Sequence, residues 1–214
     1  MTAPLTLYFV RHGEVHNPDE ILYGRLPDFH LSTIGRGQAS AAARYLADKP
    51  IVAVYTSPME RAQETATIIE SAHLEFSDVF IDERLNEVHC PYDGTTIEDL
   101  EKIHFDLYSG SPPAYEQPRD IRRRVLDFIA DIRQQYANQA IAAVSHGDIM
   151  VSMFMFAHRA DENDIGRSRH EEHRNRLQEM GLPDEYPATA SLSRLTFMTD
   201  DPEEVPDYRY ILPY

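Results

Sequence analysis

Apolar residues along the chain form short continuous runs, which alternate with longer segments that have a helical spacing. Three runs are apolar almost throughout, as expected of strands covered on both faces of a sheet: 5–10, 51–57 and 140–147. Shorter or less regular runs predict further strands at 79–82, 190–197 and 208–213.

The segments between these runs have the composition and the end signals of helices. Residues 32–50 predict a helix with Ser32 as its N-cap and Pro50 as its stop. Residues 120–136 predict an amphipathic helix, and residues 148–158 predict an apolar one. One face of the amphipathic helix is expected to contain Val125, Ile129 and Ile132.

A further helix is predicted at 57–70, directly after the second apolar run. Ser57 is its expected N-cap, Pro58 occupies the first helical position, and Glu60 stands three residues after the cap. This arrangement is typical of a capping box, in which the cap and the third residue satisfy each other's backbone N–H groups.

Strands that alternate with helices predict an α/β protein with a mostly parallel sheet and helices on both faces, a three-layer sandwich. The 214 residues are enough for one well-buried domain and short for two. We therefore expect a single domain over 1–214. The highly charged segment at about 159–187 is expected to be an insertion in it.

Basic residues stand at three places where a predicted strand ends and a helix or loop begins. Arg11 and His12 follow the first strand, Arg61 follows the second, and His146 follows the strand that begins at residue 140. Ligands of parallel α/β sheets bind at the carboxyl ends of the strands. Helix N-termini and arginine side chains both favour phosphate, so the pattern predicts an anion site.

The overall charge changes what this site can be used for. Twenty basic and thirty-six acidic residues give a net charge of −16, which argues against nucleic acid or an anionic membrane as a partner.

Apolar runs are too short to span a bilayer, and the first strand begins too early for a signal peptide. With Cys90 as the single cysteine, we expect a cytoplasmic protein without an internal disulfide.

Four segments in a fixed order give the chain a resemblance to a known family. They are "RHG" at 11–13, "SPMERAQETA" at 57–66, "DERLNEVH" at 82–89 and "VSHG" at 144–147. Together they resemble the histidine phosphatases, the superfamily that includes the cofactor-dependent phosphoglycerate mutases. The resemblance covers most of 1–157 and resumes near the end of the chain. It implies the phosphoglycerate mutase-like form of the α/β sandwich.

The resemblance also implies a role for each matching residue. His12 would be the nucleophile that becomes phosphohistidine, Glu87 would give a proton to the leaving oxygen, and His146 would bind the phosphoryl group. The residues implied to bind substrate beside them are Arg11, Arg61, Asn17 and Gly24. The implied activity is hydrolysis of a small phosphorylated metabolite, with no metal and no cofactor.

The chemistry of these residue types agrees with that implication. A neutral imidazole is a good nucleophile near neutral pH, and its second nitrogen needs an acceptor, for which we expect a backbone carbonyl near Gly13. Fixed cations stabilise the charge on a phosphoryl group in transfer. A carboxylic acid such as Glu87 can protonate the leaving alkoxide and afterwards activate water.

The chain departs from the family pattern at several positions. Only Val15 and His16 separate "RHGE" from Asn17, and "AYEQPRDIRRR" stands where the family often has G-E-S. The segment 95–117 holds one lysine and no arginine, which favours hydrolysis over the mutase alternative. A phosphomutase and a non-catalytic phosphate-binding protein remain the alternatives. The sequence does not select a substrate, and it leaves open whether the chain forms a homodimer.

Several other polar residues have a simpler interpretation than catalysis. His16 and His30 are expected in loops, whereas His89 could reach the pocket. The charged run 167–176 contains His170 and His173, whose spacing is not that of a zinc protease, and an exposed helix is the better interpretation. Three consecutive arginines at 122–124 must point in different directions on a helix, so solvent or salt bridges are expected around them.

Overall fold

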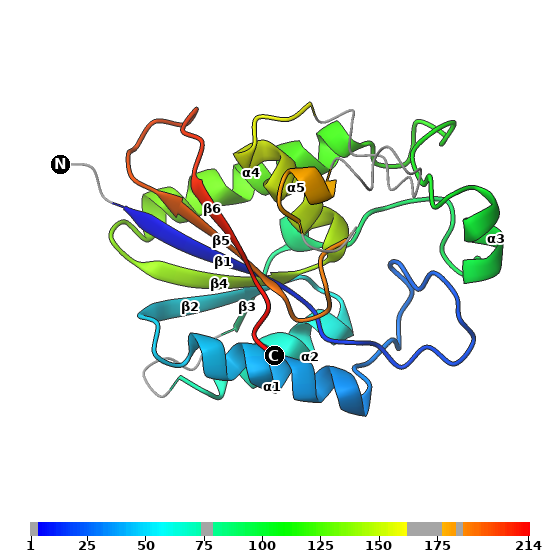
Figure 1. Cartoon of the computed structure of the whole chain (residues 1–214), viewed down its shortest axis with the longest axis horizontal. Coiled ribbons are helices and arrows are strands. Elements are labelled where there is room, and N and C mark those ends of the chain that lie inside the picture. The colour runs from blue at the N-terminus through cyan, green and yellow to red at the C-terminus, as the bar shows by residue number, and fades with distance from the viewer. Residues whose placement is uncertain (1–3, 74–78, 162–176, 183–185) are drawn as a thin grey trace.

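A six-stranded sheet with the strand order β3-β2-β4-β1-β5-β6 forms the centre of the structure, a computed structural model that describes residues 4–73, 79–161, 177–182 and 186–214 (Figure 1). The four strands β1 to β4 are mutually parallel, and β5 and β6 complete the sheet with antiparallel pairings. The strands are β1 Leu5–Arg11, β2 Ile51–Thr56, β3 Val79–Ile81, β4 Ala140–Ser145, β5 Leu192–Phe197 and β6 Asp207–Ile211.

Helices cover both faces of this sheet, which confirms the predicted three-layer α/β architecture (Figure 1). One face carries α1 (Thr33–Leu46) and α2 (Glu60–Glu70), and the other carries α4 (Pro118–Gln135) and α5 (Gly147–Ala157). Two short elements, the 3₁₀ helix η1 (Glu83–Leu85) and α3 (Ile97–Lys102), belong to the segment between β3 and α4.

The continuous apolar character of β1 follows from its position between two cores. Leu7 and Phe9 belong to the core on the α4 and α5 side, whereas Tyr8 and Val10 belong to the core beneath α1 and α2. Successive side chains of a strand point to opposite faces, so a central strand needs apolar residues at every position. The predicted apolar face of α4 is confirmed, because all three of its expected residues are buried: Val125, Ile129 and Ile132.

The register of the central strands brings their carboxyl ends together. In the pairing of β1 with β4, Arg11 lies opposite Ser145, and in the pairing of β2 with β4, Thr56 lies opposite Val144. The backbone N–H of His12 then continues the ladder by donating to the Ser145 carbonyl at 3.0 Å. The residues that follow the three strands therefore leave the sheet at one place.

The two predicted helix starts have different outcomes. Ser32 caps α1 as expected, because its hydroxyl accepts the N–H of Gly35 at 2.9 Å. The predicted capping box at Ser57 is wrong: α2 begins at Glu60, its N-cap is Met59, and no side chain caps it. Ser57 instead lies before a bend that precedes the helix: its hydroxyl accepts the Met59 N–H at 3.2 Å and also lies 2.8 Å from Nε2 of His146, at another strand end.

The charged segment 159–187 is described only at 159–161, 177–182 and 186–187. There Leu182 joins a small apolar cluster with Val151 and Met155 of α5. The assignment of this segment as an insertion in a single domain stays a prediction. Across the described ranges, no helix combines the length and the apolar character needed to cross a membrane.

The Ser32 cap gives a testable prediction about stability. Ser32→Ala removes both the bond from Gly35 and the 2.6 Å bond that the Ser32 hydroxyl donates to Glu14. We expect the free energy of unfolding to fall by about 1 kcal/mol, measured by urea denaturation. The control is Ser40→Ala in the middle of α1, where the hydroxyl only bonds back to the Arg36 carbonyl. Alanine is the better helix former there, so a loss at Ser40 as large as at Ser32 would contradict the capping role.

Candidate active site

Two histidines and one arginine meet at the carboxyl ends of β1, β2 and β4. The rings of His12 and His146 lie 5.2 Å apart between centroids. Their side chains are almost completely buried, at 1% and 0% exposure, and Arg61 of α2 is also 0% exposed. The structure thus brings together three of the residues that the sequence assigned to the site.

His12 has one ring nitrogen fixed by the backbone and one directed into the site. Its Nδ1 lies 2.8 Å from the carbonyl oxygen of Gly13, as expected. A carbonyl only accepts, so this contact places the ring proton on Nδ1. Nε2 is left as the basic nitrogen, and Nε of Arg61 lies 3.3 Å from it. Gly13 itself has no room for a side chain, because an added Cβ would lie 2.4 Å from the Gly35 carbonyl oxygen.

The Arg61 guanidinium is the centre of the contacts in this site. One of its terminal nitrogens, NH2, donates to the Gly24 carbonyl at 2.7 Å and lies 3.3 Å from Nδ1 of His146. The other, NH1, is buried without a hydrogen-bond partner among the described residues. The ring of Tyr23 covers the guanidinium at 4.7 Å and lies edge-on to His12.

Arg11 adds a second cation with an unsatisfied donor. Its NH1 donates to the Pro187 carbonyl, and its guanidinium lies 4.9 Å from the ring centre of Tyr186. Its Nε is buried and has no hydrogen-bond partner in the described part of the chain. Buried donors of this kind are normally paired, so two of them on arginines at one site indicate an anionic ligand.

Glu87 presents one carboxylate oxygen to this cluster. Its Oε2 lies 3.3 Å from Nδ1 of His146 and 3.7 Å from NH2 of Arg61. Its Oε1 accepts the backbone N–H of Val88 at 2.9 Å. The geometry therefore separates the two oxygens into one held by the backbone and one that faces the site.

The loop residues assigned to the site have different positions. Gly24 reaches it through its carbonyl oxygen. Its φ of +36° would strain any other residue, and an added Cβ would lie 1.8 Å from Oδ1 of Asp93. Asn17 bonds instead to the backbone N–H and carbonyl of Ile21, at 3.3 and 2.9 Å. Asn17 therefore shapes this loop, and its predicted contact with substrate stays a prediction.

Burial and positive charge keep both histidines neutral. The pKa values of His12 and His146 are lowered well below 6.5, first by burial and then by the neighbouring Arg61 cation. A neutral His12 with its proton on Nδ1 has a free electron pair on Nε2. Nucleophilic attack from this nitrogen is therefore available at neutral pH.

The same three side chains could in principle hold a metal ion. One ligand atom from each of His12, Glu87 and His146 lies within 4.8 Å of the other two. The Arg61 guanidinium, however, lies within 3.7 Å of all three groups, so a divalent cation would be repelled at close range. The arrangement suits an anion better than a metal.

Other residues considered in the sequence lie outside this cluster. The ring of His89 packs against Tyr115 in a tilted arrangement with 4.8 Å between centroids, and Nδ1 of His30 lies 2.6 Å from Glu64. Arg123 and Arg124 form salt bridges, as expected. His170 and His173 lie outside the described residues.

Three contributors were missed by reasoning from the sequence. Ser57 was interpreted as a helix cap although it holds His146, and Tyr23 was not singled out although it covers Arg61. Arg25 was also missed, and its side chain donates to the Glu87 carbonyl at 2.8 Å. Of these three, only Tyr23 could have been suspected from local sequence, because it directly precedes Gly24. The contacts of Ser57 and Arg25 join segments that lie far apart in the chain.

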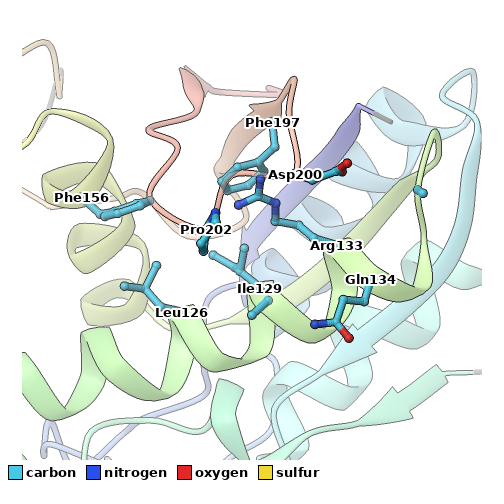
Figure 2. A pocket seen from close by; sticks show the side chains of 10 residues that line it. Leu126, Ile129, Arg133, Gln134, Phe156, Phe197, Asp200 and Pro202 are labelled. Atoms are coloured by element: carbon cyan, nitrogen blue, oxygen red, sulfur yellow. The ribbon is translucent and has the colours of Figure 1, made fainter. Parts of the chain in front are cut away.

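A second pocket of about 490 Å³ lies along the C-terminal half of α4 (Figure 2). That half of α4 leads into the start of β4, whereas His146 follows the end of β4, so the pocket is at the opposite end of the sheet. It is lined mainly by apolar side chains, among them Phe156 and Phe197. Arg133 at its edge is bonded to the Thr199 carbonyl and to Glu204. We assign no chemistry to this pocket.

The fold and the site together define an α/β protein in which two buried histidines and the buried Arg61, with the half-buried Arg11 beside them, form a site suited to an anion. The sequence profile of the histidine phosphatase superfamily (branch 1) matches residues 7–194, and the chain belongs to this superfamily. The phosphoglycerate mutase-like fold and the resemblance predicted from the four motifs are therefore confirmed.

Individual relatives agree with this assignment. An uncharacterized protein of Mycobacterium tuberculosis is 39% identical over 157 residues, which cover 68% of this chain and 75% of that protein. Fructose-2,6-bisphosphatase TIGAR B of Danio rerio is 40% identical over 170 residues, covering 76% and 65%. The structure of mycobacterial glucosyl-3-phosphoglycerate phosphatase superposes with a TM-score of 0.74 over 98% of both chains, and at 20% identity this likeness concerns the fold.

The lowered pKa values of the two histidines predict a specific dependence of stability on pH. In the unfolded chain a histidine gains its proton near pH 6.5, whereas folded His12 and His146 stay neutral to well below that value. The unfolded state then binds more protons, so stability falls as the pH falls below about 6.5. Each histidine contributes at most about 1.4 kcal/mol per pH unit.

This dependence can be measured by urea denaturation between pH 7.5 and 5.5. His12→Gln, which removes one titrating ring, should have a shallower slope than the unaltered protein. NMR of the folded protein provides the direct check, because the ring signals of both histidines should keep their neutral shifts over this range. A midpoint near 6.5 for either ring in the folded protein would contradict the predicted neutral state.

Proposed function

We propose that the protein is a metal-independent phosphomonoesterase that acts on a small phosphorylated metabolite through a phosphohistidine intermediate. The observation that supports this proposal most strongly is the set of groups around Nε2 of His12. This nitrogen is basic and buried, and Nε of Arg61 lies 3.3 Å from it, while the charge of Arg11 also helps to lower the pKa of His12. Each of the two arginines has a buried nitrogen without a partner among the described residues. Such donors suit the oxygens of a phosphoryl group.

The proposed first step transfers the phosphoryl group to the protein. Nε2 of His12 uses its electron pair to form a bond to phosphorus, while the bond from phosphorus to the ester oxygen breaks. That oxygen keeps the bonding electrons and takes a proton from Oε2 of Glu87, so the alcohol leaves uncharged. Arg11, Arg61 and His146 stabilise the charge on the remaining phosphoryl oxygens.

The second step returns His12 to its starting state. Glu87, now a carboxylate, accepts a proton from a water molecule as the water oxygen forms a bond to phosphorus. The bond between phosphorus and Nε2 breaks, and its electrons return to the ring nitrogen. Inorganic phosphate is released, and both His12 and Glu87 are ready for a second turnover.

Two relatives support a small phosphorylated metabolite as the substrate. One is named a fructose-2,6-bisphosphatase and the other a glucosyl-3-phosphoglycerate phosphatase, so both names describe removal of phosphate from a small molecule. The phosphomutase alternative has less support in this chain, because segment 95–117 offers one lysine and no arginine to hold an acidic substrate.

The nucleophile can be tested by trapping the intermediate. His12→Ala should abolish covalent labelling by a ³²P-labelled monoester and reduce turnover by several orders of magnitude, because the pathway through the protein is removed. The assay should contain excess chelator, in which the unaltered protein is expected to keep its activity. Near-normal turnover of the folded His12→Ala variant would refute the phosphohistidine pathway, and loss of wild-type activity on chelation would refute metal independence.

The acid role of Glu87 predicts a dependence on the leaving group. Glu87→Gln keeps the shape of the side chain but cannot give up a proton as an acid does. An alkyl phosphate expels a poor leaving group, for which general acid help is worth roughly 10²- to 10⁴-fold, whereas nitrophenolate leaves with little help. We expect a much larger loss in the single-turnover rate of phosphoenzyme formation with a sugar phosphate than with nitrophenyl phosphate. Equal losses would show that another group is the acid.

A further inference from the structure

Glu116, in the segment before α4, is the meeting point of three chain segments next to the site. Its carboxylate accepts from Arg25 at 3.0 Å, from Nε of Arg124 at 2.7 Å and from NH2 of Arg124 at 3.3 Å. It also accepts the backbone N–H of His89 at 2.8 Å, while its own N–H donates to the His89 carbonyl at 2.9 Å. Glu116 therefore joins the loop after β1, the loop that carries Glu87, and α4.

The two arginines bound by Glu116 both reach the backbone of Glu87. Nε of Arg25 donates to the Glu87 carbonyl oxygen at 2.8 Å, and NH2 of Arg124 lies 3.4 Å from the same oxygen. Arg124 also donates to the Arg84 carbonyl at 2.6 Å, which fixes the chain three residues earlier. Without the carboxylate between them, two like-charged guanidinium groups converging on one carbonyl would repel each other.

The held carbonyl determines where the Glu87 carboxylate points. The Glu87 carbonyl and the Val88 N–H belong to one planar peptide group, so fixing the first fixes the second. The Val88 N–H in turn donates to Oε1 of Glu87 at 2.9 Å. With Oε1 held in this way, Oε2 remains as the oxygen that faces His146 and Arg61, at 3.3 and 3.7 Å.

We propose that Glu116 is a positioning residue for the reaction: through Arg25 and Arg124 it orients the Glu87–Val88 peptide, so that the acidic oxygen of Glu87 meets the leaving group. This proposal rests on the proposed role of Glu87 as the proton donor. Glu116 has no assigned contact with substrate; it acts through the two arginines, and its bonds to the His89 backbone hold the same loop. Small errors in the placement of a catalytic group are costly, since a displacement of about 1 Å can reduce a rate by about 10²-fold.

The chain offers a matched control in Glu204. Its carboxylate also accepts from an arginine, NH2 of Arg133 at 3.0 Å, and from backbone N–H groups, those of Met198 and Thr199 at 2.6 and 3.0 Å. Its side chain is 14% exposed, close to the 18% of Glu116. Glu204, however, is bonded to Arg133, which lines the second pocket at the far end of α4 (Figure 2).

Glu116→Gln and Glu204→Gln should therefore be compared in the full chain. Glutamine replaces one acceptor oxygen by a donor, which then faces a guanidinium or a backbone N–H. For Glu116→Gln we expect a loss of about 10- to 100-fold in the single-turnover rate with a sugar phosphate and a loss below about 3-fold with nitrophenyl phosphate. Glu204→Gln should destabilise the protein to a similar degree and change the ratio between the two substrates by less than about 2-fold.

Two further variants exclude a merely structural effect. Arg25→Lys keeps a cation but loses the Nε donor, and it should reproduce the selective loss even if Glu116→Gln does not fold.

Combining Glu87→Gln with Glu116→Gln should add less than about 3-fold to the loss of Glu87→Gln alone on the sugar phosphate, because both act on one proton transfer. Equal losses on both substrates in Glu116→Gln, an unselective Arg25→Lys, or fully multiplied losses in the double variant would overturn the proposal. If Glu87→Gln itself showed no dependence on the leaving group, the proposed acid would fail first, and this proposal with it.

Discussion

The buried cation of Arg61 is the constraint on which the rest of the site depends. Removing a guanidinium from water costs several kcal/mol unless its surroundings replace the lost hydration. Here the replacement comes from the Gly24 carbonyl, the face of Tyr23, the two histidines and the more distant Glu87 carboxylate. One nitrogen of Arg61 is left without a described partner, and the proposed anionic substrate would complete the compensation.

The same cation determines the state of both imidazoles. A protonated histidine next to Arg61 would place two positive charges about 3.3 Å apart in a buried site. Burial alone already disfavours the charged ring, and Arg61 increases the effect, so the pKa of each histidine is lowered well below 6.5. The residue proposed to bind the phosphoryl group thus also keeps His12, the proposed nucleophile, in its neutral form.

The acidic surface and the cationic pocket work over different distances. A net charge of −16 gives no long-range attraction for a phosphorylated substrate. At physiological ionic strength, however, charges are screened beyond about 8 Å, whereas buried pairs are screened much less. Substrate affinity should therefore come from short-range donors such as those of Arg11 and Arg61.

The part of the structure built from the sheet could be predicted from the sequence. A central strand must be apolar at every position, and parallel strands bring their carboxyl ends together, so the positions of His12 and His146 followed from local pattern alone. The start of α2 was predicted wrongly for a physical reason. A serine before a proline and a glutamate has the sequence of a cap, but the Ser57 hydroxyl bonds to the Met59 N–H in a bend before the helix and to His146, which is 89 residues away.

Short elements held by long-range contacts could not be predicted in this way. The helix α3 has six residues, fewer than two turns, so no apolar period can show within it. Arg25, Glu116 and Arg124 read as ordinary exposed charges in the sequence, because their partners are up to 91 residues apart. Only the folded structure shows that these three side chains bond to one another and to the Glu87 loop.

The site therefore consists of two parts with different physical origins. The proposed phosphate-binding residues follow the ends of β1, β2 and β4, strands whose own side chains belong to the two hydrophobic cores. Glu87, the proposed acid for the leaving group, lies on a loop that is held by bonds between side chains and loop backbone. Examples are the bond from the Arg25 side chain to the Glu87 carbonyl and the bond from the Arg25 N–H to the Asp93 carboxylate. Loops can change length and sequence at little cost to the sheet. In the proposed mechanism, the placement of the nucleophile His12 therefore depends on the core strands, whereas the orientation of the Glu87 carboxylate depends on loop residues.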